Sequence, residues 1–319
     1  MFKIAHLLAQ AGGQDREEFQ DIMVRRARGA AAAIAIGDPA VTEAAREFIF
    51  SDADFRSLAQ LAHRHAGIAL SDSKRNLVYT RVSRRLRALG FTAFKDYRNY
   101  LAGNAGELES FINAISTNLT KFFREAHHFD HFRSHAVLPF INGGRRGDGR
   151  FRVWSAGCST GEEPYTIAAV LRREIPSSTR HDIRILATDI DTDVLAKAAR
   201  GVYPIGGVDN IPRMYREYFE PVGESRGGED LKATENIRSL IVFRRLNLIE
   251  QWPFRGKFDA VFCRNVMIYF DHATKAALIE RFVECIKPGG FLYIGHSESF
   301  HGSHPQLQLV SRTTYRRRA

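Results

Sequence analysis

The sequence has few cysteines that could cross-link a small fold and no long apolar run that could anchor the chain in a membrane. Its 319 residues include only three cysteines, Cys158, Cys263 and Cys285, which are far apart and form no C-x-x-C pair. This spacing argues against a disulfide framework and a cysteine zinc site, and it is typical of a protein from a reducing cytoplasm. No apolar run approaches the roughly 20 residues that a membrane-spanning helix needs. We therefore expect a cytoplasmic protein that does not insert into membranes.

What the sequence does contain is an ordinary globular composition with a basic surplus. It is 44% hydrophobic and 26% charged, with a formal net charge of +10. A chain of this length can form two domains with cores of their own. A basic balance favours an acidic partner, either a nucleic acid or an acidic protein surface, and does not choose between them.

The pattern along the chain changes near residue 145. We expect an extension of unknown role at 1–48, an all-helical domain at 49–141, and strand–helix alternation typical of an α/β fold at 150–319. A small inserted subdomain is expected at about 203–242, with short strands at 231–233 and 237–243. The tail is predicted as one edge strand at 307–315, followed by a frayed end at 316–318.

Within the helical domain, one predicted helix carries a cluster of arginines. Arg81, Arg84 and Arg85 gather on a face away from the apolar positions. The cluster is either a solvated basic face or a docking surface for an acidic helix or a nucleic-acid backbone. Nucleic acid is the weaker of the two docking partners, because no aromatic residues alternate with the arginines to stack on bases.

The most informative stretch is FRVWSAGCSTGEEPY, residues 151–165. It predicts a strand, a tight turn of small residues around Gly157, and a helix that begins with two acids, Glu162 and Glu163. A phosphate-binding loop would offer bare N–H groups and often a lysine. Acids in that place favour a nucleoside with positive charge, such as S-adenosylmethionine. The alternative is that the acids only stabilise the start of the helix.

Polar residues end two further predicted strands. Asp189 follows the second strand, where a doubly wound fold holds ribose hydroxyls on a carboxylate, and Arg264 and Asn265 end the strand at 258–263. No G-x-G-x-x-G is present, and the interval from Gly157 to Asp189 is long for a nicotinamide-cofactor site. A dehydrogenase is therefore disfavoured.

A last polar cluster lies before the α/β region. Asn118, Thr120 and Arg124 stand among apolar residues, and three histidines follow at intervals of four, His127, His131 and His135. The histidine spacing fits a metal site, but no H-E-x-x-H and no cysteine supports it. We expect a surface helix rich in histidine and no metal.

Together these pieces resemble the CheR family, the bacterial chemotaxis receptor glutamate methyltransferases. The resemblance runs from about residue 50 to 315 and excludes residues 1–48. The matching motifs are NLTKFFRE (118–125), WSAGCSTGEEPY (154–165), ATDID (187–191), LNL (246–248), FDAVFCRNVMIYF (258–270) and GHSESF (295–300).

The resemblance implies a Rossmann-like S-adenosylmethionine-dependent methyltransferase domain behind a helical domain, with S-adenosylhomocysteine as the product. It implies that Asp189 takes the ribose, that Asn247 and Leu248 lie along the adenine, and that Tyr269 stands near the transferred methyl. It further places these residues at the cofactor: Asn118, Thr120, Arg124, Gly157, Arg264, Asn265 and one of Glu162 and Glu163, with Arg124 also near the reacting groups.

The implied reaction is methyl-ester formation on glutamate side chains of chemoreceptors, with the helix around Arg81 to Arg85 meeting the receptor. The inserted subdomain is similar to one that some members use to tether to a receptor tail. Two other functions stay open: a methyltransferase for another substrate such as RNA or a small acid, and a non-catalytic regulator that binds the cofactor or a receptor without turnover.

Overall fold

The computed structural model describes residues 46–143, 149–225, 228–298 and 304–319. The chain divides into two units, residues 1–49 and 50–319, and every feature below belongs to the second. The predicted extension at 1–48 lies almost wholly outside the described residues. In the described part of the chain, no helix is long and apolar enough to cross a membrane.

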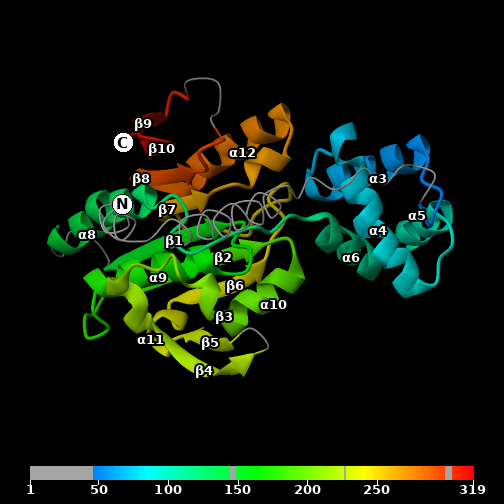
Figure 1. Ribbon diagram of the computed structural model, residues 1–319. Coiled ribbons are helices and arrows are strands. Elements are labelled where there is room, and N and C mark those ends of the chain that lie inside the picture. Colours follow the sequence, from blue (N-terminus) through cyan, green and yellow to red (C-terminus); the bar gives the residue numbers. More distant parts are fainter. Residues whose placement is uncertain (1–45, 144–148, 226–227, 299–303) are drawn as a thin grey trace, which may run out of the picture. The chain divides into compact units, whose positions relative to one another are not determined.

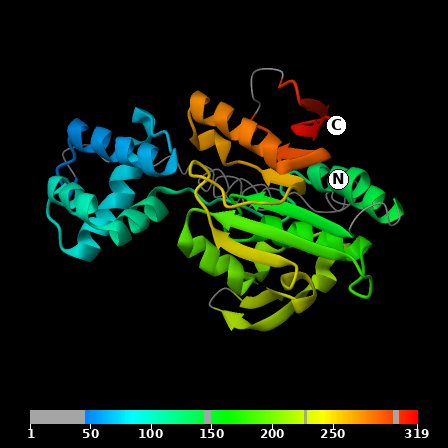
Figure 2. The same ribbon diagram turned by 180° about the vertical axis from the view of Figure 1, so that it is seen from behind.

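Four helices form the predicted helical region, and Figures 1 and 2 show them packed as one group. Ser51 begins the first with a capping box, and Gly67 ends it in the left-handed conformation. The second buries Val78, Val82 and Leu86 at the predicted helical spacing. The helices are α3 (Asp52–Ala66), α4 (Arg75–Leu89), α5 (Phe94–Gly103) and α6 (Ala105–Ile115).

A seven-stranded sheet carries the rest of the unit, in the order β6-β2-β1-β7-β8-β10-β9. The first five strands in this order run parallel, whereas β10 and β9 are antiparallel to their neighbours. The strands are β1 (Arg150–Ala156), β2 (Asp182–Asp189), β6 (Ile241–Arg245), β7 (Phe258–Cys263), β8 (Ile286–Ile294), β9 (Leu307–Ser311) and β10 (Thr314–Arg317). This mixed sheet confirms the α/β class that the strand–helix alternation predicted.

Helices cover both faces of this sheet, so its central strands are apolar on both sides. On one face, Val153 and Phe262 pack with α7 (His127–Phe132) and α9 (Glu162–Glu174). On the other, Trp154 and Val261 pack with α12 (His272–Cys285). The remaining helices are α8 (Leu138–Asn142), α10 (Thr192–Arg200) and α11 (Glu235–Arg238).

A separate three-stranded sheet, in the order β3-β5-β4, lies in the region predicted as an insertion. Its strands are β3 (Val202–Pro204), β4 (Phe219–Ser225) and β5 (Gly228–Ala233). The strand predicted at 237–243 is wrong in part. Ile237 is buried on α11, and the next strand, β6, pairs with β2 at the edge of the large sheet instead. The small sheet therefore ends at Ala233.

The C-terminal prediction also needs correction, because the tail is a hairpin and not one strand with a frayed end. Strands β9 and β10 pair with each other, and Arg316 pairs with Phe291 of β8. The Arg318 N–H still donates to the carbonyl of Gln306, at 2.8 Å. A run of arginines predicts exposed side chains, but their backbone can complete a sheet all the same.

Candidate functional site

The turn between β1 and α9 opens the pocket on which the predicted site residues converge. Gly157 has φ +83, and a Cβ at that position would overlap a methyl carbon of Val266 on the opposite wall. Only glycine combines this left-handed conformation with so close an approach. The turn is held to the second strand, because the Gly157 N–H donates to the Thr188 carbonyl at 2.8 Å.

The two acids after this turn have different surroundings, which sequence reasoning could not distinguish. Glu163 lines the pocket, accepts from the Ser155 hydroxyl at 2.7 Å and pairs with Arg264 at 3.1 Å. Glu162 accepts from the Thr160 hydroxyl at 2.7 Å and is not among the pocket-lining residues. Burial raises the pKa of the Glu163 carboxyl, against the opposing effect of the nearby Arg264 guanidinium.

Asp189 ends β2 and presents a buried carboxylate to the same pocket. Its Oδ2 accepts from the Ser159 N–H at 2.8 Å and its Oδ1 from the Asp191 N–H at 3.0 Å. Burial raises its pKa to about 6, although these N–H groups oppose the shift. A carboxylate has about four acceptor positions. The carboxylate therefore keeps some capacity to accept from a ligand hydroxyl.

Arg264, at the end of β7, is the buried cation of the site, with a side chain only 2% exposed. Its guanidinium lies between two carboxylates, 3.1 Å from Glu163 and 3.5 Å from Glu125, and donates to the backbone carbonyl of Arg124. Burial alone would raise the pKa of Glu125, but His296 and Arg264 together lower it to about 2. Glu125 was not among the predicted site residues, because nothing in its local sequence marks it as the partner of a distant arginine.

The segment after Arg264 forms another wall of the pocket. Asn265 has φ +60, and the chain then turns through Met267–Tyr269. The Tyr269 hydroxyl donates to the carbonyl of Thr117 at 3.3 Å, and the Tyr269 carbonyl accepts from the N–H of Ala69 at 2.8 Å. Burial raises the pKa of Tyr269. Tyr269 is thus held as a neutral phenol between the helical region and the sheet.

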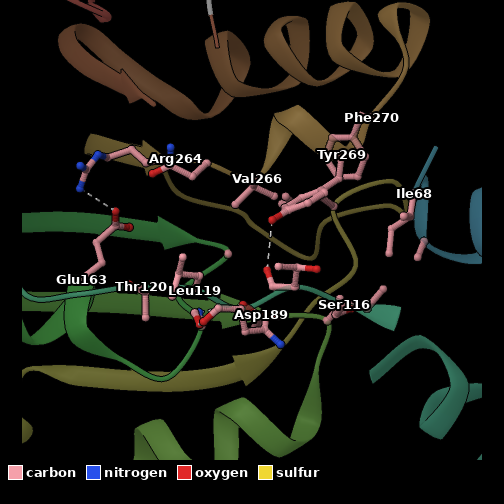
Figure 3. Close-up of a pocket in the computed structure, with 18 of the residues that line it drawn as sticks. Ile68, Ser116, Leu119, Thr120, Glu163, Asp189, Arg264, Val266, Tyr269 and Phe270 are labelled. Atoms are coloured by element: carbon pink, nitrogen blue, oxygen red, sulfur yellow. Dashed lines mark hydrogen bonds and ion pairs between the residues drawn. The ribbon is translucent and has the colours of Figure 1, made fainter. Parts of the chain in front are cut away.

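The pocket gathers most of the predicted site residues and adds an apolar wall. Figure 3 shows Glu163 and Arg264 facing each other at one end and Phe270 and Ile68 at the other, with Asp189 and the ring of Tyr269 between them. The predicted residues that line the pocket are Asn118, Thr120, Arg124, Gly157, Glu163, Asp189, Asn247, Leu248, Arg264, Asn265 and Tyr269. The lining apolar residues that were not predicted include Ile68, Ile115, Leu119, Ile190, Val266 and Phe270.

Two of these residues already use their side-chain amides within the protein. Asn118 donates to the Asp191 carboxylate at 2.7 Å, and Asn247 donates to the His65 carbonyl at 2.7 Å. Both amides therefore shape the pocket wall by linking the helical region or its following segment to the sheet. The family resemblance implied that both residues lie at the cofactor, and it did not indicate these partners.

The predicted docking arginines also differ from one another. Arg81 donates to the carbonyls of Ile115 and Ser116 at the end of α6, at 2.8 and 2.7 Å. Arg85 forms two hydrogen bonds with the buried carboxylate of Glu107. Arg84 is exposed. Two of the three guanidinium groups are therefore engaged in holding α4 against α6, and Arg84 presents its charge to solvent.

The histidines do not form the group that their spacing of four indicated. His131 stacks on His135, with ring centroids 4.2 Å apart, and contacts the Tyr293 hydroxyl at 3.1 Å. The stretch is only partly a surface helix, because His128 is buried. Ligand atoms of Glu125, His127 and His128 lie within 4.8 Å of one another. The Arg264 guanidinium beside Glu125 opposes a second cation there.

The donor set fits a cationic nucleoside. The carboxylate of Glu163 lies beside Arg264 at one end, the carboxylate of Asp189 can accept from ligand hydroxyls, and the other end is apolar. This fold and pocket define a Rossmann-like methyltransferase that binds S-adenosylmethionine.

Comparison with known proteins makes the assignment specific. Residues 53–116 match the family described as CheR methyltransferase, all-alpha domain, and residues 118–316 match CheR methyltransferase, SAM binding domain. The chain belongs to the CheR methyltransferase family.

Several curated relatives support the same assignment. The chain is 44% identical to a chemotaxis protein methyltransferase of Escherichia coli, over 83% of this chain and 91% of that one. It is 41% identical to a probable chemotaxis protein methyltransferase of Rhizobium etli, over 80% and 96%. It is also 41% identical to chemotaxis protein methyltransferase 2 of Pseudomonas aeruginosa, over 85% and 95%. The chain is thus a methyltransferase of chemotaxis that uses S-adenosylmethionine.

Proposed function

We propose that this protein methylates glutamate side chains of chemoreceptors and forms glutamyl methyl esters. The proposal rests on the order of groups along one pocket. A buried carboxylate paired with an arginine lies at one end, a second carboxylate follows, and the other end is apolar. That order matches the ammonium, ribose and adenine of S-adenosylmethionine. The names of the relatives, chemotaxis protein methyltransferases, support a substrate within the chemotaxis machinery.

In this assignment the cofactor lies along the pocket with its methionyl end at Glu163 and Arg264. Glu163 accepts from the ammonium, since it lines the pocket and Glu162 does not. Asp189 accepts from the ribose hydroxyls. Leu248, with the backbone of Asn247, lies along the adenine.

Bound S-adenosylmethionine supplies a methyl group activated by its sulfonium charge. The receptor glutamate needs no base, because a carboxyl with an ordinary pKa near 4.3 is ionised at neutral pH. The protein's task is to align the reacting atoms at about 3–3.5 Å and to exclude water. Tyr269, held by Thr117 and Ala69, closes the pocket beside the reacting centre. Arg124 donates to the Leu119 carbonyl at 2.9 Å and can orient the incoming carboxylate.

The receptor partner is proposed from charge. Residues 51–140 include the exposed Arg84, and the whole chain carries +10, which suits a helix that presents several acids. The small sheet formed by β3, β4 and β5 is the proposed tether for a receptor tail. All three cysteines are free, which supports placing the activity in a reducing cytoplasm.

The test is to mix the protein with methyl-labelled S-adenosylmethionine and receptor-rich membranes, then to release label with mild base. Base-labile label on the receptor, lost in Asp189→Ala and Arg124→Ala, is the expected result. Cofactor binding without base-labile label would refute the receptor substrate and direct the search to other acceptors, beginning with RNA. Failure to bind the cofactor would leave only a non-catalytic regulator.

A further inference from the structure

Glu298 is a buried carboxylate outside the pocket lining, only 5% exposed, whose hydrogen bonds go to the backbone of the site. Its Oε2 accepts from the N–H of Asn265 at 2.7 Å and of Gly295 at 2.6 Å. Its Oε1 accepts from the N–H of Ile268 at 3.1 Å. One side chain therefore joins the loop after β8 to both ends of the turn that carries Asn265 and leads into Tyr269.

The turn has a particular need for this carboxylate. Asn265 has φ +60, a left-handed conformation that is uncommon for side-chain-bearing residues, although asparagine adopts it more often than most. Successive N–H groups around such a residue form a concave site for an anion. Glu298 fills this site from within the chain, and each bond gains strength from its charge.

The loop that carries the carboxylate packs closely against the turn. A Cβ at Gly295 would lie 2.6 Å from the Asn265 amide nitrogen and 2.7 Å from Glu298 Oε2. The loop after β8 thus lies directly against the turn. A second carboxylate, Glu125, accepts from His296 of the same loop at 2.9 Å and lies beside Arg264. The loop at 295–298 therefore contacts Asn265 directly and is linked to Arg264 through Glu125.

We propose that Glu298 is a positioning residue for methyl transfer: it fixes the backbone of Asn265–Ile268 so that Arg264, Asn265 and Tyr269 meet the cofactor correctly. This assignment rests on the proposed methyltransferase function. Glu298 acts through that backbone and touches neither substrate nor cofactor. Removing its acceptors should therefore change cofactor affinity and turnover, and not merely the amount of folded protein.

The experiment compares Glu298→Gln with Asp259→Asn. Asp259 lies at the opposite end of β7, where it accepts from the Arg152 N–H at 2.8 Å and from Lys287 at 2.9 Å. Both variants convert a structural carboxylate to an amide, but only one adjoins the site. Cofactor Kd is measured by titration calorimetry, kcat by base-labile methyl ester per folded enzyme, and folded fraction by circular dichroism.

We expect Glu298→Gln to raise the cofactor Kd at least about tenfold and to lower kcat by up to about 100-fold, since a misplacement of about 1 Å can cost that much. Asp259→Asn should lower the Tm while Kd and kcat per folded enzyme stay as in the wild type. Equal Kd and kcat effects in the two variants, or none in Glu298→Gln, would overturn the proposal.

Two further arms keep the result decisive. If Glu298→Gln does not fold, Glu298→Asp keeps the charge but shortens the reach, and the same criteria apply to it. If the wild type binds cofactor but forms no ester, the proposed function fails on its own. The calorimetric comparison then still decides whether Glu298 positions the cofactor residues, because it requires no methyl acceptor.

Discussion

The two acids at the start of α9 give the sharpest test of the site, because they are neighbours in sequence with different surroundings. Glu163 lines the pocket and Glu162 does not. We expect Glu163→Gln to weaken S-adenosylmethionine binding strongly and Glu162→Gln to leave it within about twofold. The pair is well matched, since each substitution removes one negative charge from the same helical turn and so changes the helix-end electrostatics alike.

The size of the effect follows from the contacts. A hydrogen bond to a charged group contributes about 1.5–3 kcal/mol. Losing the one between Glu163 and the cofactor ammonium should therefore raise the Kd about 10- to 150-fold. Glu163→Gln also leaves Arg264 with Glu125 as its remaining carboxylate, at 3.5 Å. A lower Tm should accompany the weaker binding, because an arginine with a 2% exposed side chain loses one of the two carboxylates that neutralise its charge.

Binding is measured by titration calorimetry at pH 7 and thermal unfolding by circular dichroism without cofactor. The ratio of the two Kd values is the deciding quantity. Equal Kd values for the two variants, or a larger effect from Glu162→Gln, would show that the methionyl end does not lie at Glu163. A lower Tm without a change in Kd would show that Glu163 serves only to neutralise Arg264.

Three further predictions concern the ribose site, the docking helix and the glycine turn. The pKa of Asp189 is raised to about 6 by burial, and the ribose needs the ionised form. Cofactor affinity should therefore be full above that pKa and fall as pH drops from 7 to 5, with the slope of a single protonation. Titration calorimetry checks this, and the pH dependence should be absent in Asp189→Asn. Arg84→Ala should raise the receptor KM and leave the free energy of unfolding within about 0.5 kcal/mol, whereas Arg85→Ala should destabilise by about 1.5–3 kcal/mol in urea unfolding. Gly157→Ala should abolish cofactor binding, as measured by equilibrium dialysis. Gly90 also has a left-handed φ, but a Cβ there would meet nothing within 4 Å, so Gly90→Ala should lower stability alone.

Local patterns predicted the elements that position the site. The strand, turn and helix at 150–174 follow from apolar alternation, glycine and a first-turn proline, all of which act within a few residues. Asp189 was predicted at a strand end because parallel strands place their carboxyl ends at one edge. The spacing of Val78, Val82, Leu86 and Leu89 likewise predicted the buried face of α4, except that Leu89, the last residue of the helix, is exposed.

Partners that lie far apart in sequence could not be predicted this way. Arg85 has a charged side chain on a polar face, but Glu107, 22 positions later, accepts both of its hydrogen bonds. The distinction between Glu162 and Glu163 depends on Arg264, 101 positions away from Glu163. Glu298 was inside a recognised motif, yet its role requires knowing that the backbone of Asn265 passes beside it.

These partners also bear on the proposed methylation of a carboxylate at a site that contains Arg124 and Arg264. A guanidinium paired tightly with the substrate carboxylate would stabilise the ground state and reduce its nucleophilicity, which is the opposite of what the reaction requires. Arg264 is already neutralised by Glu163 and Glu125 and is almost fully buried. In the proposed reaction, an incoming glutamate would therefore meet a cation whose charge is largely neutralised, and Arg124, which is partly exposed, would orient it. Glu163, the proposed partner of the cofactor's ammonium, thus also helps Glu125 to protect the nucleophile from over-stabilisation.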